Sequence, residues 1–182
     1  YSFNNSRLNA EWVGFTLDWY YKLAHNEEML AAAGNSLLIA LVASLVATAL
    51  GTMAGVAMYR YKLRLLPVLV LTPIAIPENL MGVALLIFFV LLNFTLGLVS
   101  VALAHIAFCV GFVAIVVRTN LAMLDESIFE AARDLGAGPW QTFRRVTLPL
   151  ILPAVLAGFL MSFTLSIDDF VITVFVAGVG VT

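Results

Sequence analysis

The sequence predicts an all-α polytopic membrane protein. Only 11% of its 182 residues are charged and 63% are hydrophobic, whereas a soluble domain carries about 25% charged residues. Four apolar runs, roughly 34–59, 66–92, 97–117 and 150–175, are each near or above the ~20 residues that a helix needs to cross a bilayer. Because lipid offers the backbone no hydrogen-bond partners, we expect these runs to be helices rather than isolated strands.

The segment 1–33, which precedes the first apolar run, has a mixed composition. It contains the aromatic residues Trp12, Phe15, Trp19, Tyr20 and Tyr21 and the acids Glu11, Asp18, Glu27 and Glu28. Aromatic side chains with a polar edge favour the headgroup zone of a membrane. We therefore expect residues 1–33 to form an interfacial segment that lies on the periplasmic face of the membrane and residues 34–182 to form the transmembrane permease domain. No basic stretch followed by an apolar core starts at Tyr1, so no signal peptide is expected there.

The basic residues predict which loops face the cytosol. Seven of them lie in two loops, namely Arg60, Lys62, Arg64, Arg118, Arg133, Arg144 and Arg145, and only Arg7 and Lys22 precede them. Loops rich in Lys and Arg stay on the cytosolic side. The loops 60–65 and 118–149 are therefore expected inside the cell, with both ends of the chain outside.

The longest polar run, within loop 118–149, reads as two short helices joined by a turn. Asp125 is an expected N-cap, followed by acids at the positive end of the helix, and Ile128, Ala132 and Leu135 share one face. Gly136 is expected to end the first helix in a left-handed turn. Gly138-Pro139 is expected to start the second helix. That helix has Trp140 and Phe143 on an apolar side, and Arg144 and Arg145 are expected to close it.

Three acids lie within the apolar runs, where a charge costs a few kcal/mol. Glu78 follows Pro77, and Pro73 lies four residues earlier, so the second run should be kinked or open there. Asp168 and Asp169 lie late in the fourth run, ~27 Å along a helix from its start, and adjacent residues point ~100° apart. We expect all three to line the outer half of a substrate pathway, with at most one of the two adjacent acids facing it.

Each acid also has a structural alternative. Asp168 and Asp169 could reach the outer headgroups or cap the helix end, and Glu78 could pair with a neighbouring hydroxyl group or with His105. His105 itself is expected to be a packed, hydrogen-bonded group, since two residues on one helix, His105 and Cys109, do not make a metal site. Gly51 and Gly55 are spaced to let two helices approach closely.

Charge and motif content limit the class of function. The acids, with no Lys or Arg inside the four runs, favour an organic or metal cation over an anion, and Phe163 and Phe170 could contact a cationic amine. The net charge of −2 gives no case for nucleic acid. Neither Lys22 nor Lys62 follows a Gly-rich phosphate loop, so no ATP site is expected here. An intramembrane protease is a remote alternative, because no Gly-x-Gly-Asp or Gly-x-Ser-x-Gly run is present.

The spacing in the polar loop resembles a known family. Glu130-Ala131-Ala132, three residues, Gly136, nine residues, Val146, one residue and Leu148-Pro149 resemble the EAA loop of binding-protein-dependent ABC importer permeases, which usually carry isoleucine where Val146 stands. The resemblance implies a type I ABC importer transmembrane domain, of which this chain would hold about four of six core helices. It also implies that Glu130, Ala131, Ala132, Leu135, Gly136 and Pro139 couple the chain to partner ATPase subunits.

Three further regions resemble the polyamine (spermidine/putrescine) branch of those permeases. They are Tyr1–Ser6 leading to Gly14–Tyr20, Ala104–Cys109, and Ser162–Asp169, together with the pair Pro77-Glu78. The resemblance implies import of polyamines across a bacterial inner membrane. Related branches share parts of these motifs, so the alternative is a permease of the same class that carries another small cation or organic solute. It also implies a second permease subunit, a periplasmic substrate-binding protein that delivers the cargo, and ATP with Mg²⁺ bound only by the partner ATPases. No cofactor, metal or catalytic residue is expected in this chain.

Overall fold

The computed structural model describes residues 2–6, 11–61 and 64–178. Tyr1, Arg7, Lys62 and Thr182, on which some of the sequence-based expectations fall, lie outside these residues. The chain forms two compact units, Tyr1–Leu37 and Leu38–Thr182. Across the described ranges the regular elements are helices, and one isolated β-bridge joins Asn4 to Phe15.

The first unit is organised around the fully buried residue Asn4. Its side-chain amide donates to the Glu11 carbonyl at 2.7 Å and accepts from the Val13 backbone N–H at 2.9 Å. Its own carbonyl accepts from the Trp19 indole at 2.8 Å, which ties helix α1 (Asp18–Ala24) to the preceding loop. The first unit is therefore folded rather than a loose linker. Its interfacial location stays a prediction.

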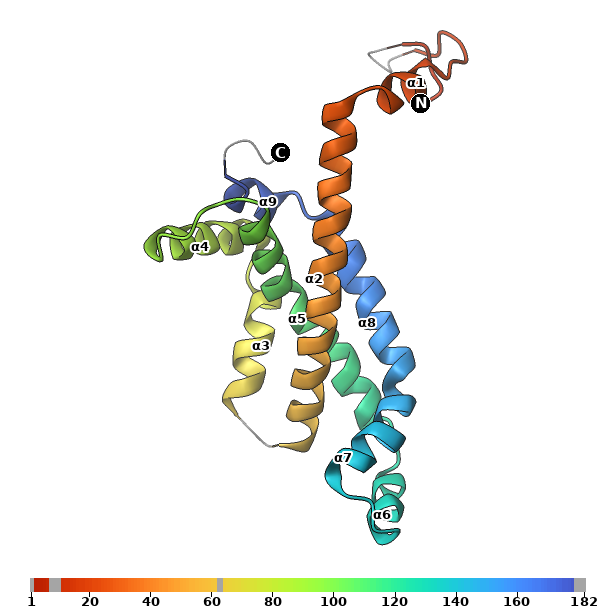
Figure 1. Cartoon of the computed structure of the whole chain (residues 1–182), viewed down its shortest axis with the longest axis vertical. Helices are drawn as coiled ribbons and strands as arrows, with labels where there is room; N and C mark the ends of the chain where they lie inside the picture. Colours follow the sequence, from red (N-terminus) through yellow and green to blue (C-terminus); the bar gives the residue numbers. More distant parts are fainter. Residues whose placement is uncertain (1, 7–10, 62–63, 179–182) are drawn as a thin grey trace. The chain divides into compact units, whose positions relative to one another are not determined.

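Three helical stretches are long and apolar enough to cross a membrane. They are α2 (Glu27–Arg60), α5 (Leu98–Ala122) and the stretch Pro139–Asp168. They correspond to the first, third and fourth apolar runs of the sequence. In the second unit, α2 ends, α3 begins and α5 ends at the same end of the bundle (Figure 1). This arrangement agrees with a chain that crosses the bilayer back and forth.

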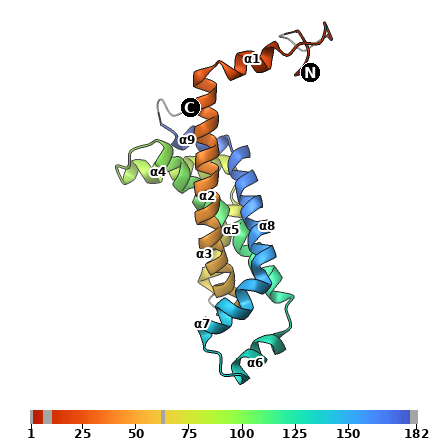
Figure 2. The ribbon, with the colours of Figure 1, turned by 45° about the vertical axis from the view of Figure 1, so that its right-hand side comes forward.

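The second apolar run is not one straight span. Helix α3 (Leu65–Ala75) and helix α4 (Glu78–Leu91) meet at a bend of 113°, so that α4 lies crosswise to α3 (Figures 1 and 2). The break lies at Ile76, which is extended (φ −86°, ψ 131°) because the ring of Pro77 disfavours a helical conformation of the residue before it. The predicted kink is confirmed, and it is sharp enough to turn the chain.

The helix that contains the fourth apolar run starts and ends earlier than the predicted run 150–175. Helix α7 (Pro139–Thr142) continues through a π-helical turn, η1 (Phe143–Thr147), into α8 (Leu148–Asp168). The expectation that Arg144 and Arg145 close the second loop helix is therefore wrong. Pro149 lacks a backbone N–H and its ring crowds the carbonyl four residues back. The wider π turn, in which the Leu148 N–H reaches the Phe143 carbonyl, accommodates it.

The chain breaks again after α8. Asp169 is extended (φ −72°, ψ 115°) and a separate helix α9 (Val171–Val176) follows. The predicted run 150–175 is thus two helices, and the two adjacent acids stand at their junction.

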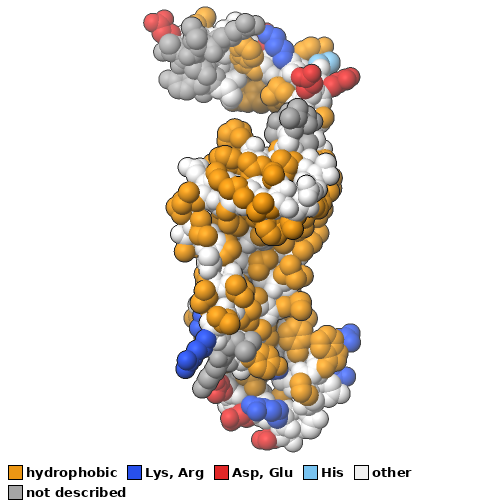
Figure 3. Space-filling view, turned by 90° about the vertical axis from the view of Figure 1, so that its left-hand side faces the viewer, with side chains coloured by type: hydrophobic (Ala, Val, Ile, Leu, Met, Phe, Trp, Pro, Cys, Tyr) orange, Lys and Arg blue, Asp and Glu red, His pale blue; other side chains and the backbone are white. Residues whose placement is uncertain are grey.

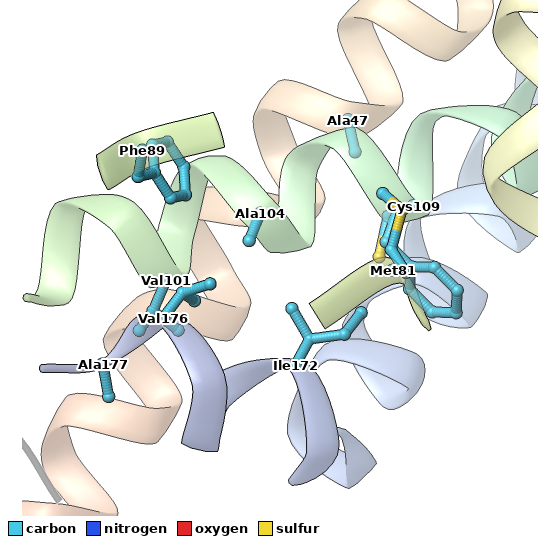
Figure 4. Packing of buried hydrophobic residues seen from close by; sticks show 10 residues of the cluster. Ala47, Met81, Phe89, Val101, Ala104, Cys109, Ile172, Val176 and Ala177 are labelled. Atoms are coloured by element: carbon cyan, nitrogen blue, oxygen red, sulfur yellow. The ribbon is translucent and has the colours of Figure 1, made fainter. Parts of the chain in front are cut away.

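Helix α5 is the centre of the second unit, where it packs against α3, α8 and α9. Two glycines of α2 also let that helix approach α5 closely. A Cβ atom added at Gly51 would lie 2.6 Å from Val113 Cβ, and one at Gly55 would lie 2.8 Å from the Ala114 carbonyl oxygen. The predicted role of these two glycines in close helix approach is confirmed. Figure 4 shows the buried cluster in which Ala47 of α2 joins side chains of α4, α5 and α9.

The outer surface of the bundle is apolar, as expected for contact with lipid. Large hydrophobic side chains such as Leu69 and Leu160 are 72% and 61% exposed. In the second unit, Lys, Arg, Asp and Glu gather at the end that carries helices α6 and α7, and orange apolar side chains cover the middle (Figure 3).

Replacing Gly51 with leucine is expected to destabilise the protein by separating α2 from α5. Overpacking of this kind costs about 1–3 kcal/mol, and the nearest atoms include the Val110 carbonyl oxygen at 2.8 Å, which belongs to a helix backbone. The measurement is the thermal unfolding midpoint of the purified protein in detergent. Gly34→Leu is the matched control, because nothing lies within 4 Å of a Cβ atom at Gly34 in the same helix. Equal midpoints for the two variants would contradict the packing argument.

Candidate functional site

Two regions of the second unit carry the residues singled out from the sequence. One is the loop formed by α6 (Glu126–Asp134), α7 and η1, and the other is the α8–α9 junction with the neighbouring helix α4. They lie at opposite ends of the bundle (Figures 1 and 2). The predicted coupling residues and the predicted pathway residues are therefore far apart in the fold.

Helix α6 begins as the sequence predicts. The Asp125 carboxylate accepts a hydrogen bond from the Ser127 backbone N–H at 2.9 Å. This bond lowers the pKa of Asp125, since it favours the charged form. Asp125 is therefore a genuine N-cap.

The buried face of α6 differs from the predicted one. Phe129 and Ala132 are buried, whereas Ile128 is 38% and Leu135 is 89% exposed. Of the three residues that were expected to share one face, Ile128, Ala132 and Leu135, only Ala132 packs on the bundle, so the predicted face is not the one that α6 buries. The larger ring of Phe129, three residues before Ala132, supplies the contact with the bundle, and Leu135 follows the last helical residue and points away.

The turn after α6 has the geometry of a Schellman motif. Gly136 has φ +79°, its N–H donates to the Arg133 carbonyl at 2.9 Å, and the Ala137 N–H donates to the Ala132 carbonyl at 3.0 Å. Helix α7 then starts with Gly138 as N-cap and Pro139 as its first residue. The predicted left-handed turn and the predicted restart are both confirmed.

A cavity of about 830 Å³, which the sequence did not predict, separates this loop from the ends of α2 and α5. Its walls carry two guanidinium groups, three aromatic rings and one carboxylate. The lining residues are Val56, Tyr59, Arg60, Tyr61, Leu121, Glu126, Phe129, Arg133, Gly136, Ala137, Gly138, Pro139, Thr142 and Thr147. Because the walls come from segments as far apart in sequence as Val56 and Thr147, no local sequence signal indicates the cavity.

The outer face of the loop carries the remaining predicted coupling residues. Glu130, Ala131, Leu135 and Pro139 are exposed, and Ala132 is buried beneath them. Trp140 is 70% exposed and stacks on Phe143 with a centroid distance of 5.7 Å. The loop thus presents a carboxylate beside large apolar side chains.

At the other end of the bundle, the Asp169 side chain is buried and both of its carboxylate oxygens accept hydrogen bonds. Its side chain is 3% exposed and accepts from the backbone N–H groups of Ile172 at 3.3 Å and Thr173 at 3.1 Å. The Thr173 hydroxyl donates to it at 3.2 Å, and His105 Nε2 lies 3.1 Å from Oδ2. The carboxylate therefore caps α9 and joins it to α5.

His105 is the packed, hydrogen-bonded group that the sequence predicts. Its Nδ1 lies 2.7 Å from the Ser166 hydroxyl, and its Nε2 lies 3.0 Å from the Thr173 hydroxyl and 3.1 Å from Asp169. Within the described residues its acidic partner is thus Asp169, and the alternative of a pair between His105 and Glu78 is not found.

The cluster shares residue types with a serine hydrolase but not the geometry. In a hydrolase triad the histidine Nε2 faces serine and Nδ1 faces aspartate. Here Nδ1 faces Ser166 and Nε2 faces Asp169, and the Ser166 side chain is buried. The arrangement gives no support to the protease alternative.

The other two acids are exposed. Asp168 borders a shallow hollow of about 370 Å³ with Thr164, Leu165 and Ile167. Glu78 is the first residue of α4, where the helix dipole favours a negative charge. Helix α4 packs along α9, with Gly82 against the ring of Phe175. The adjacent acids therefore point apart, with Asp169 inward and Asp168 outward.

A helical bundle with an apolar belt, a polar helix–turn–helix loop at one end and acids at the other has the architecture of a membrane transport subunit. The chain belongs to the family of binding-protein-dependent transport system inner membrane components, which matches residues 47–182. The family resemblance and the fold class that the sequence predicts are thus confirmed, as is a location in the inner membrane.

Several relatives are similar over almost the whole chain. The spermidine/putrescine transport system permease protein PotC of Escherichia coli (strain K12) is 42% identical over 180 residues, 97% of this chain and 68% of the relative. The putrescine transport system permease protein PotI of the same strain is 41% identical over 192 residues, 100% of this chain and 68% of the relative. PotC of Haemophilus influenzae is 39% identical over 182 residues, 98% of this chain and 71% of the relative. These relatives are transport permeases.

Replacing Gly136 with alanine is expected to loosen the turn between α6 and α7. A side chain in the left-handed conformation costs about 1–2 kcal/mol, and no neighbour lies within 4 Å of a Cβ atom there, so backbone strain acts alone. The expected result is faster amide hydrogen exchange at Gly136 and Ala137. Gly138→Ala is the control, since that site is equally open but has φ −66°. Identical exchange in both variants would contradict the assignment of strain to Gly136.

Proposed function

We propose that this chain is the permease subunit of an ATP-driven importer that moves spermidine or putrescine across the inner membrane. The observation that carries the proposal is the 41–42% identity, over nearly the whole chain, to permeases named for these two polyamines. Partner ATPase subunits bind ATP and Mg²⁺ and dock on the α6–α7 loop. A second permease subunit completes the pathway, and a periplasmic binding protein delivers the cargo to its outer end.

The charge distribution supports a cationic cargo. Acids occur at the α8–α9 junction and at the start of α4, and no Lys or Arg occurs in residues 65–117 or 146–178. An anionic cargo would require donors or a cation that these segments lack. Asp168 and Glu78 are exposed and could contact an ammonium group, and Phe170, which follows Asp168 closely in sequence and is 73% exposed, offers a ring face. Asp169 does not face outward; its carboxylate caps α9 and holds the α8–α9 junction together.

The loop geometry supports a docking role. In this proposal Glu130, Ala131 and Leu135 on the outward face contact the ATPase, while Ala132 seats α6 on the bundle. Gly136 sets the bend, and Pro139 starts the helix that continues into the membrane. An exposed side chain such as Leu135 favours association, because a partner removes it from water.

The experiment that tests the proposal is polyamine uptake. The complete transport system is expressed in cells that lack their own polyamine importers, and uptake of radiolabelled spermidine and putrescine is measured with and without this chain. We expect uptake that requires both this chain and ATP hydrolysis. Normal assembly without uptake of either polyamine would overturn the assignment of the cargo, and uptake of another cation would replace it.

Glu130→Ala is expected to weaken ATPase docking while the bundle stays folded. Glu130 is exposed on α6, so its loss leaves the packing of Phe129 and Ala132 intact. A residue at the centre of an interface contributes about 1–3 kcal/mol, so we expect at least about tenfold less ATPase recovered with the purified permease. Asp134→Ala, an exposed acid on the same helix, is the control. Unchanged recovery and unchanged uptake for Glu130→Ala would remove this residue from the interface.

Asp168→Asn and Asp169→Asn are both expected to reduce uptake without loss of assembly. The first removes an exposed charge that a cation could contact, and the second weakens the bonds that cap α9. Hydrogen bonds to a charged group contribute about 1.5–3 kcal/mol, so uptake per assembled complex should fall at least about tenfold. Asp18→Asn in the first unit is the control. Normal uptake in both variants would exclude the two acids from the pathway.

A further inference from the structure

The junction between α8 and α9 is held by one imidazole ring. His105 of α5 contacts Ser166 of α8, Thr173 of α9 and Asp169 between them. The side chains of His105 and Asp169 are each 3% exposed, so water competes little for these bonds. These four side chains are called the junction network below.

We propose that His105 is a positioning residue for transport: with a proton on Nε2, which faces Asp169, it fixes the α8–α9 junction against α5 and so sets where the exposed acids stand. The ring acts through Asp169 and does not itself contact the cargo. The predicted effect on transport rests on the proposed function. The predicted proton on Nε2 and the hydrogen bonds of the ring are independent of it.

The hydrogen-bond partners assign the proton. A carboxylate only accepts, so His105 Nε2, 3.1 Å from Asp169 Oδ2, must carry a hydrogen atom. The other ring nitrogen, Nδ1, forms the second hydrogen bond of the ring, with the Ser166 hydroxyl at 2.7 Å. The Thr173 hydroxyl donates to the same carboxylate at 3.2 Å. One tautomer of the ring thus satisfies every member of the network.

The network also accounts for the break in the chain after α8. The first free N–H groups of α9, those of Ile172 and Thr173, bond to the Asp169 carboxylate instead of to a preceding helical turn. A buried carboxylate without enough donors is costly. Removing the donor from His105 therefore destabilises the charged form of Asp169 and, with it, the cap of α9.

The position of α9 affects both exposed acids. Asp168 immediately precedes the capped junction, and α9 packs along α4, whose first residue is Glu78. The contact is close, since a Cβ atom at Gly82 would lie 2.6 Å from the ring of Phe175. Release of α9 from α5 would therefore displace the segments that carry Asp168 and Glu78.

The proton assignment can be tested without any cargo. The assembled complex is labelled with ¹⁵N-histidine, and the His105 signals are identified as those that disappear in His105→Gln. We expect a single state of the ring with a proton on Nε2, and loss of this single state in Asp169→Ala. An Nε2 without a proton, or a mixture of tautomers, in the unsubstituted chain would overturn the proposal.

The positioning role is tested with two substitutions of similar volume. Glutamine retains a donor that can reach Asp169 and leucine does not, so His105→Leu should lower polyamine uptake per assembled complex about tenfold and His105→Gln by no more than about threefold. The double variant His105→Leu, Asp169→Leu should be no worse than His105→Leu alone, since the residues act as one unit. Cys109→Ala, one turn away on α5 and also buried, is the control.

Three results would overturn the role. They are normal uptake in His105→Leu, equal loss in the glutamine and leucine variants, and additive losses in the double variant. If the unsubstituted complex takes up no polyamine at all, the proposed function fails, and the tautomer experiment alone decides whether His105 holds the junction.

Discussion

In lipid, each backbone N–H and C=O group must find its partner within the protein, and this constraint governs the points at which helices of the second unit are interrupted. The helices of the second unit are interrupted at Ile76-Pro77, at Phe143–Thr147 and at Asp169. Each interruption has its own remedy. Pro77 has no N–H group to satisfy, the π turn keeps its bonds with a longer reach, and the Asp169 carboxylate accepts the free N–H groups of α9.

Helix α5 makes these interruptions tolerable because it supplies a fixed surface for the broken pieces. Glycines bring the neighbouring helices close, as at Gly111, where a Cβ atom would lie 2.6 Å from the Val70 carbonyl oxygen of α3. Such contact replaces the hydrophobic effect, which acts little between apolar helices in an apolar solvent. The bundle is thus held together by close packing at small residues and by a few buried hydrogen bonds, while its outer side chains are largely hydrophobic.

The sequence predicts the features that depend on neighbours along the chain. The cap at Asp125, the turn at Gly136 and the break before Pro77 follow from the chemistry of those residues alone. Features that join distant segments could not be predicted. His105 and Asp169 are 64 positions apart, and their distance follows from how α5 meets the α8–α9 junction. The buried face of α6 was predicted wrongly for a related reason. Which of its residues is buried depends on the side chains of α5 and α8 against which Phe129 packs.

The π turn at Phe143–Thr147 joins the short loop helix α7 and the long apolar helix α8 into one continuous helix. The stretch from Pro139 to Asp168 contains 30 residues, about 45 Å at the helical rise. One extra residue in a turn also rotates the following helix by about 100° relative to an unbroken α-helix. The π turn therefore decides which side chains of α8 face the bundle, while the stretch from Pro139 to Asp168 stays one continuous helix.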